Sequence, residues 1–413
     1  MSIPSLWAVY VQLLPKILPV LYYILPIISG LIIWQLYLYY IRYGFVKKME
    51  WVLLEIKMPK EIFKSPAGME VIFSTLHQTG GGSLIDKFIK GKVRSWFSLE
   101  ICSFGGDVKF FVRVEKKFRD LFEAAAYSQY PEIEIHEAED YVHKVPYGVV
   151  EAQQDMWGAV LKFSKPDPYP IKTYIDYGLD KKEKDALVNV DPLTPIIEFL
   201  GSIKPGEQVW VQIPIMAARD LRRKPGGKWH EKEGWKKEGE ALVDEIMKRD
   251  AKTKASKQMS ATGFPIIPSL SKGEQEVIEA IERSIAKLGF EAGIRMIYFA
   301  PEGKINNNYK GAILSMFKQF NSQNLNGFDR EFDTSFDYPW QDFMGLRLAK
   351  MKADLFNAYR LRSLFWMPYP AKTFVLNTEE LATIFHFPGA VSQTPTFGRI
   401  MSKRAEPPPN LPV

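Results

Sequence analysis

The longest hydrophobic stretch of the chain covers residues 17–41 and contains no charged side chain. A membrane-spanning helix needs about 20 largely apolar residues, so the pattern predicts a spanning helix over about 17–41. Trp34 and Tyr37 lie toward its C-terminal end, as is typical of a membrane–water interface. The alternative is a cleaved signal peptide, which would have an apolar core of about 7–15 residues and a small-residue cleavage site. Neither feature is present, so we expect a retained anchor.

Basic residues are concentrated after this stretch. Arg42, Lys47 and Lys48 follow it directly, whereas Lys16 is the only charged side chain that precedes it. An excess of Lys and Arg marks the cytoplasmic side of a membrane helix. We therefore expect a single-pass protein of the inner (cytoplasmic) membrane whose remaining part is cytoplasmic. The sequence leaves open whether residues 1–15 make a second contact with membrane lipid.

Residues 49–145 alternate strand-like and helix-like patterns. Apolar residues recur at every second position in the strand-like runs and at helical spacing between them. In order, we expect a strand over 51–58, a helix from Ser65-Pro66, a hairpin turning at Gly105-Gly106-Asp107, a helix over 116–127 and a strand around Ile133 and Ile135. This βαββαβ order is that of the ferredoxin-like split βαβ unit.

Residues 146–325 predict a second, looser copy of the same order, interrupted by an insertion over 218–270. The expected elements are strands over 158–163 and 171–177, a helix over 195–203, a strand over 208–215, a helix with a Ser271–Glu274 capping box that ends at Gly289, a strand over 294–299 and a helix over 309–320. The sequence therefore predicts an α+β protein with two ferredoxin-like α/β sandwich modules after the membrane helix.

The C-terminal region, residues 326–413, is predicted to be largely helical and to end in a proline-rich linker. A helix is expected over 348–365, with Lys350, Lys352, Arg360 and Arg362 on its outer positions. A short strand over 374–376 and a helix from Thr378 follow. The expected domains are residues 1–48, 49–145, 146–325 and 326–413.

The net charge of +6 is a local feature. Residues 219–257 carry 13 Lys and Arg against 8 Asp and Glu, so the remainder is nearly neutral. Basic groups interleaved with tryptophans can contact nucleic-acid phosphates and bases or anionic lipid headgroups. A solvated segment without a ligand is the third interpretation. The candidate contact residues are Arg222, Arg223, Lys224, Lys228, Trp229, Trp235, Lys236 and Lys237.

Other candidate chemical sites do not meet their sequence requirements. The cluster from His136 to His143 lies on a predicted strand, where alternate side chains point to opposite faces and cannot converge on a metal. The glycines of residues 79–83 lack the spacing of a phosphate-binding P-loop. The single cysteine, Cys102, lies in a predicted strand and is expected to be a small buried residue. We therefore expect no catalytic residue, cofactor or metal, and a protein that is not an enzyme.

Six strings together carry a resemblance to a known family. They are WFSLEI (96–101), FRDLFEAAAYSQYPEIEI (118–135), KPDPYPIKTYIDYGLD (165–180), DPLTPIIEFLGSIKPGEQ (191–208), FDYPWQDF (336–343) and FVLNTEELATIFHFPG (374–389). They resemble the membrane-anchored N-terminal region, a domain of unknown function, of bacterial proteins related to type IV secretion coupling ATPases. In those relatives a hexameric P-loop DNA-pump motor follows, and this chain ends where the motor would begin.

The resemblance implies a non-enzymatic module that docks or orients a separately encoded coupling ATPase during type IV secretion-like, conjugation-type transfer of DNA or protein. It implies a docking surface near Glu379, Glu380 and His386, and a homo-oligomeric ring to match a hexameric motor. The alternatives are a remnant of such an ATPase without activity of its own, and an anchored protein that binds lipid or nucleic acid.

Overall fold

The computed structural model describes residues 6–58, 65–145, 154–180, 191–219, 222–223, 232–247, 270–336 and 338–388. The chain divides into two compact units. One comprises residues 1–49 and 80–94, and the other comprises residues 50–79 and 95–413. We call them the anchor unit and the body. Residues 80–94 lie within the sequence of the first expected module, yet they group with the N-terminal helix.

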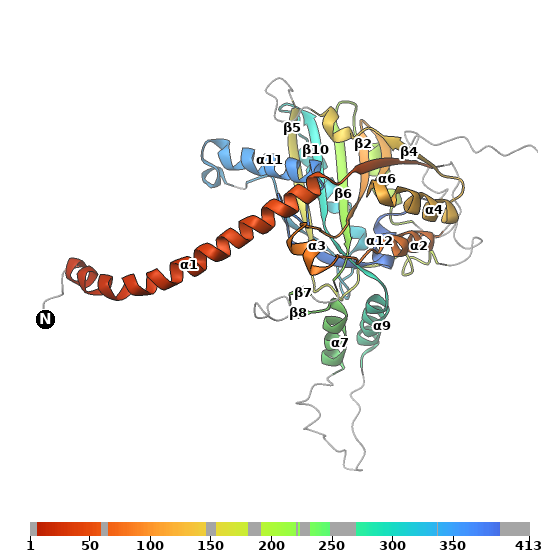
Figure 1. The fold of residues 1–413 in the computed structure, drawn as a ribbon. Helices are drawn as coiled ribbons and strands as arrows, with labels where there is room; N and C mark the ends of the chain where they lie inside the picture. Colours follow the sequence, from red (N-terminus) through yellow and green to blue (C-terminus); the bar gives the residue numbers. More distant parts are fainter. Residues whose placement is uncertain are drawn as a thin grey trace, which may run out of the picture. The chain divides into compact units, whose positions relative to one another are not determined.

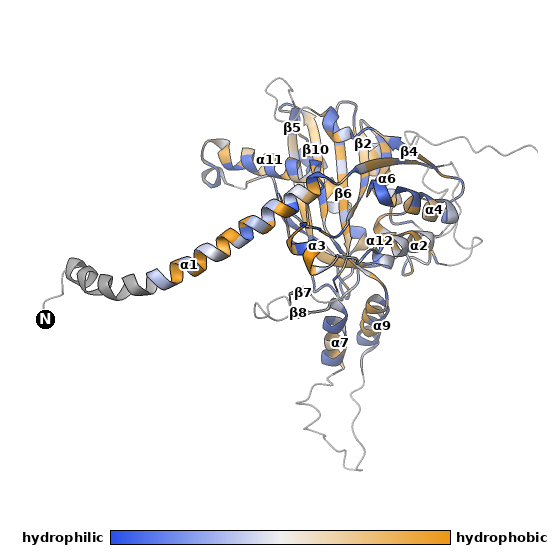
Figure 2. Cartoon of the chain, viewed as in Figure 1, coloured by the Kyte–Doolittle hydropathy of each residue, from blue (hydrophilic) through white to orange (hydrophobic). Residues whose placement is uncertain are grey.

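The anchor unit is built on one long helix, α1 (Leu6–Lys47). Its segment Tyr22–Lys47 has a mean hydropathy of 1.7 over the most apolar window and is long enough to cross a membrane. Figure 2 shows hydrophobic positions all along this segment, and nearly all of its side chains are exposed. A helix that is apolar on every side avoids water when lipid surrounds it. The predicted apolar N-terminal helix is therefore confirmed, and it extends beyond both predicted ends.

The body is organised around one antiparallel sheet (Figure 1). Its main path runs β11-β5-β10-β6-β2-β3-β1-β4, and β9 and β12 extend it beside β6. This confirms an α+β fold with an antiparallel sheet. The strands are β1 (Trp51–Lys57), β2 (Phe97–Phe104), β3 (Asp107–Glu115), β4 (Glu134–Ala138), β5 (Gln154–Phe163), β6 (Gln208–Ala217), β9 (Gly289–Ala292), β10 (Ile294–Pro301), β11 (Phe328–Asp333) and β12 (Phe374–Asn377).

The two halves of this sheet repeat one strand order. Taken in chain order, β1, β2, β3 and β4 are arranged fourth-first-third-second, and so are β5, β6, β10 and β11. The halves join through antiparallel pairing of β2 with β6, from Phe97 opposite Ile215 to Phe104 opposite Gln208. Antiparallel pairing of equivalent strands relates the halves by an approximate two-fold axis. One continuous sheet therefore crosses the expected boundary between the modules.

Helices cover both faces of the sheet. Neighbouring residues of a strand point to opposite faces, so apolar residues on each face form a separate core that a helix covers. Leu54 packs in the larger core and the adjacent Leu53 in the smaller one. The larger core is covered by α2 (Ala67–Leu76), α4 (Arg119–Gln129), α6 (Thr194–Gly201), α10 (Asn307–Ser315) and α12 (Thr378–Ile384). The opposite face is covered by α11 (Leu346–Arg360), whose Phe356 and Tyr359 pack on Trp210 and Phe299 (Figure 1).

The insertion contributes the helix α7 (Trp235–Ile246) and the short paired strands β7 (Arg222–Arg223) and β8 (Lys232–Glu233). The helix α7 packs against α9 (Lys272–Ala286), which follows the insertion. The predicted capping box between Ser271 and Glu274 is present at the start of α9. The predicted end of this helix at Gly289 is wrong, because Gly289 is the first residue of β9. A Cβ at Gly289 would lie 2.8 Å from the Trp235 ring, so a glycine is needed where these elements meet.

The strand expected over 171–177 is wrong. These residues form no strand, and a turn begins at Tyr174. Lys172 donates to the Phe320 carbonyl, and three of the other N–H groups donate to side chains. Glu380 accepts from the N–H of Ile171, Asp176 accepts from that of Thr173, and Thr383 accepts from that of Tyr174. Side chains of α12 therefore replace the strand partner that the alternating pattern had suggested.

Candidate functional site

A buried charge network on the α11 side of the sheet is centred on Arg362. The Nε of Arg362 lies 2.9 Å from Glu100 Oε1 and its Nη2 lies 3.1 Å from Glu100 Oε2. Its Nη1 donates to Asp140 Oδ2 at 2.6 Å. Arg362 is completely buried and has a left-handed φ of 50°, which turns the chain back toward the sheet just after α11. The expectation that Arg362 occupies an outer helix position is therefore wrong, because the helix ends at Arg360.

Glu100, in the middle of β2, receives further donors from every side. Ser98, Tyr141 and Gln212 donate to its two oxygens at 2.7, 2.7 and 3.0 Å. Burial acts to raise the pKa of Glu100, but the Arg362 guanidinium and these donors hold it below its usual value. The carboxylate is therefore ionised and fully bonded. Through Arg362, the Glu100 carboxylate holds the end of α11 against the sheet. Both of its oxygens accept hydrogen bonds from groups of the protein.

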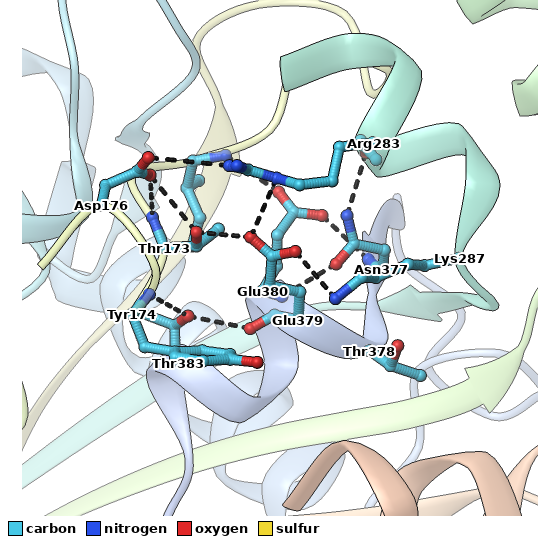
Figure 3. A network of polar contacts seen from close by, with 12 residues as sticks. Thr173, Tyr174, Asp176, Arg283, Lys287, Asn377, Thr378, Glu379, Glu380 and Thr383 are labelled. Carbon is cyan, nitrogen blue, oxygen red and sulfur yellow. Dashed lines mark hydrogen bonds and ion pairs between the residues drawn. The ribbon is translucent and has the colours of Figure 1, made fainter. Parts of the chain in front are cut away.

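A second network surrounds the first turn of α12 (Figure 3). Lys287 Nζ lies 2.8 Å from Glu379 Oε2 and 2.9 Å from Glu70 Oε2. Arg283 lies 3.4 Å from Glu379 Oε1, and Thr173 donates to the same oxygen. These residues come from α2, α9, α12 and the 171–177 turns. The network therefore joins helices from both halves of the body.

Glu380 lies beside this network but has no cationic partner among the contacts that hold it. Its oxygens accept from the backbone N–H groups of Ile171 and Asn377, and Asn377 caps α12 by accepting from the Glu380 N–H. Burial raises the pKa of Glu380 to about 8, although the two backbone donors act in the opposite direction. Glu380 is therefore a buried group that changes its charge near neutral pH.

His386 is also held inside the body. Its Nδ1 bonds to the carbonyl of Ala382 at 2.9 Å, and its Nε2 lies 3.1 Å from Asp191 Oδ1. Burial acts to lower the pKa of His386. Asp191 and the backbone groups raise it by more than burial lowers it, so the pKa is above its usual value. The pair fixes the end of α12 to the start of α6.

The predicted docking residues are therefore interior residues. Glu379, Glu380 and His386 are each at most 2% exposed. A partner could reach them only if this part of the body opened, so in the folded chain these three side chains do not form a docking surface. These residues were selected because they lie close in sequence to the C-terminal segment. Position in the sequence does not indicate whether a side chain is buried.

The candidate contact residues of the insertion fall into three groups. Lys224, Lys228 and Trp229 lie outside the described residues, and only the backbone of Arg222 and Arg223 is described. Lys236 and Lys237 are exposed at the start of α7, where a ligand could reach them. Trp235 is buried against Ala218 and Val375, so its ring is not available to stack on a base.

The other sequence candidates are engaged in the body as follows. Cys102 is completely buried near the Tyr359 hydroxyl, and burial raises the pKa of its thiol, so its predicted role as a small buried residue is confirmed. His136 contacts Glu134, and Asp140 belongs to the Arg362 network. In the described parts of the chain, no group of His, Cys, Asp and Glu has the arrangement of a metal site.

Sequence reasoning did not identify an exposed aromatic patch that precedes α11. The rings of Tyr338 and Trp340 stack with centroids 4.6 Å apart and planes at 12°. Trp340 is 78% exposed and Met344 77% exposed, and Leu346, at the start of α11, is also exposed. Arg347 donates to the Gln341 carbonyl at 2.8 Å, which shapes the loop, and Lys350 is exposed on the next turn. Large apolar side chains that gather on a surface usually mark an interaction site.

The aromatic patch, defined as Tyr338, Trp340, Met344 and Leu346, overlaps the FDYPWQDF string at 336–343. In the sequence, this string was used only as one of the six strings that carry the family resemblance. Its unusual density of aromatic residues next to a proline was the one signal that could have indicated an exposed surface.

Comparison with known proteins identifies the family of the chain. No curated protein matches the sequence. A family described as a domain of unknown function (DUF8128) matches residues 45–399, which include the whole described body. The match begins at the end of α1 and covers both halves of the sheet and α12. The chain therefore belongs to the DUF8128 family of domains of unknown function.

Proposed function

We propose that this protein is a non-enzymatic, membrane-anchored docking module that orients a P-loop coupling ATPase at the bacterial inner membrane, in type IV secretion-like transfer of DNA or protein. The observation that carries the proposal is the aromatic patch. Its residues Tyr338 and Trp340 lie in the string 336–343, one of those on which the expected relationship to coupling ATPases rests, and Trp340 and Met344 are exposed to solvent. Exposed tryptophans at the centre of apolar patches are typical anchors of protein interfaces.

The buried networks support a docking role over a chemical one. Arg362 and Glu100 bind each other, and Lys287 and Glu379 do the same. Charged groups committed in this way give a rigid scaffold. A rigid body lets a small exposed patch hold a partner in one orientation, because little order is lost on binding.

The basic residues after α1 support the proposed orientation. Lys47 and Lys48 are exposed at the end of the apolar helix. Because such residues favour the cytoplasmic side, the body would face the compartment in which ATP is available.

We also propose that each half of the body is a ferredoxin-like module. The support is the repeated fourth-first-third-second strand order, with α2 and α4 crossing over in the first half and α6 and α10 in the second.

The patch is tested by co-purification from detergent-solubilised native membranes. We expect the tagged full-length chain to recover a protein with a P-loop signature, identified by mass spectrometry. The double variant Trp340→Asp, Met344→Asp should reduce that recovery at least about tenfold, since charges in the centre of an apolar interface are not solvated when the partner binds.

The matched control is Leu121→Asp, which places a charge on an exposed apolar residue of α4. It should recover the ATPase as the wild-type chain does. Equal recovery by the double variant, or a wild-type preparation that recovers no P-loop protein, would contradict the proposal. The second result would favour a remnant without activity or another anchored role.

A further inference from the structure

We propose that residues 84–92 form a second membrane contact, in which the short helix α3 (Leu84–Phe88) and the residues after it lie in the lipid headgroup region beside the C-terminal part of α1. The inference goes beyond the docking role and does not depend on it. It rests on α1 crossing the membrane.

The first observation is direct contact between this segment and α1. The Phe88 and Trp34 rings have centroids 5.9 Å apart, and the Tyr37 hydroxyl donates to the Phe88 carbonyl at 3.2 Å. Gly91 has a left-handed φ of 68°, and a Cβ there would lie 2.4 Å from the Ile41 carbonyl oxygen. A residue with a side chain would not fit this approach. The segment is therefore packed along the last turns of the apolar helix.

The position of these contacts along α1 sets the depth of the segment. Trp34 and Tyr37 belong to the aromatic end of the apolar stretch, and Lys47 follows about two to three helical turns later. Tryptophan and tyrosine concentrate at membrane–water interfaces. When α1 spans a bilayer, residues packed against Trp34 and Tyr37 must lie near that interface, because both belong to the same compact unit.

The second observation is the apolar surface that the segment leaves uncovered. Leu84 is 71% exposed and Ile89 65% exposed, and Ile85 and Phe88 are also exposed. Trp34 of α1 partly covers Phe88, but all four side chains remain exposed in the described structure. They are costly in water and favourable in lipid, since burial of apolar area stabilises in proportion to that area.

Polar groups are arranged so that this segment can enter the interface. The Ser83 hydroxyl accepts from the Asp86 N–H, and Asp86 Oδ2 accepts from the Ser83 N–H, so a capping box bonds the free N–H groups of the first turn. Lys90 pairs with Asp86 at 2.9 Å. Backbone groups must be bonded internally where water is scarce.

Three lysines complete an amphipathic pattern. Lys87 and Lys90 are exposed and Lys92 is half-buried, close to the apolar residues 84, 85, 88 and 89. Basic residues that flank exposed Leu, Ile and Phe are typical of segments that lie in the plane of an anionic membrane surface. The lipid bilayer is therefore the occupant of this surface, because the anchor already holds it at the depth where lipid is found.

The test uses the purified full-length chain in nanodiscs of phosphatidylcholine and phosphatidylglycerol. Ile85→Cys and Ile89→Cys carry an environment-sensitive fluorophore, with the exposed body position Leu121→Cys as the control. Cys102 is completely buried and stays in place. Leu31→Cys, in the middle of the apolar helix, reports whether α1 is in the bilayer.

We expect labels at positions 85 and 89 to be quenched by lipids with a nitroxide near the headgroup at least about twice as strongly as the label at position 121. Iodide in the water should show the opposite order. Labels at 85 and 89 that iodide quenches like position 121 would overturn the inference, as would labels shielded from both quenchers, which would indicate packing against protein.

The label at position 31 separates two kinds of failure. If lipid nitroxides do not quench it, α1 is not in the bilayer, and the inference fails at its premise. If they quench it while positions 85 and 89 remain in water, only the second contact fails. No partner protein is present in this assay, so its result is independent of the proposed docking of an ATPase.

Discussion

Replacing Arg362 by methionine is expected to lower the free energy of unfolding by about 3–5 kcal/mol. The variant leaves the carboxylate of Glu100 inside the body without the guanidinium that binds both of its oxygens. An isolated buried charge is far more costly than a buried pair. Thermal or denaturant unfolding of the full-length chain in detergent, followed by tryptophan fluorescence, measures the loss.

Two further variants separate the charge effect from a packing effect. Arg360→Gln removes an exposed charge at the last residue of α11, two residues before Arg362. It should change the unfolding free energy by less than about 0.5 kcal/mol. The double variant Arg362→Met, Glu100→Gln should recover at least half of the loss, because the unpaired charge is gone. A single variant as stable as wild type, or a double variant without recovery, would show that the ion pair does not hold α11 to the sheet.

Stability is expected to fall as the pH rises from about 5 to 9, with Glu380 as a principal cause. The pKa of Glu380 is raised from 4.5 to about 8 in the folded chain. Between these pH values the folded state holds a proton that the unfolded state has released. Each unit of increase in pH therefore lowers the free energy of unfolding. Since one pKa unit corresponds to about 1.4 kcal/mol, the total change is on the order of 3–5 kcal/mol. Unfolding free energies measured at each pH unit give the slope.

The variant Glu380→Gln should flatten most of this slope. Glutamine keeps one carbonyl acceptor for the Ile171 and Asn377 N–H groups, but it places an NH2 donor where the protonated carboxyl has a hydroxyl that can accept, so it should also be less stable than wild type at pH 5. His386 contributes in the same direction, because its raised pKa means that its stabilising charge is lost as the pH rises. Glu282→Gln, an exposed carboxyl of α9, controls for the loss of one charge. A slope that stays the same in Glu380→Gln would contradict the assignment.

Local pattern was sufficient for many elements of the body. Alternation over residues 108–114 predicted β3, and the spacing of Met69, Ile72, Phe73 and Leu76 predicted the buried face of α2. The turn at Gly105-Gly106 was predicted from the two glycines between alternating runs. Both glycines adopt the positive φ values that such a turn requires. These features depend on neighbours within a few residues, which is the range that periodicity can report.

Long-range arrangement was beyond local pattern. The pairing of β2 with β6 joins residues more than 100 positions apart and makes one sheet of two expected modules. The turns over 171–177 alternate like a strand, but α12 bonds their backbone. Residues 80–94 were expected to belong to the module of residues 49–145, although contacts of Phe88 and Gly91 with α1 place them in the anchor unit.

The buried networks left a signal that the sequence interpretation did not use. In the sequence, Leu355, Tyr359 and Arg362 recur at helical spacing, so the basic residue continues the series of buried positions of α11 just beyond its end at Arg360. Glu100 lies between Leu99 and Ile101 in an apolar strand, which requires a buried partner. Neither observation identifies the partner, because the two residues are 262 positions apart.

The most direct measurement of the central claim is photo-crosslinking in native membranes, with a photoreactive amino acid at position 340 and the same residue at position 121 as control. The docking account predicts that position 340 crosslinks to a P-loop ATPase and that position 121 does not. No adduct with a P-loop protein at position 340, or adducts of equal yield at both positions, would contradict it.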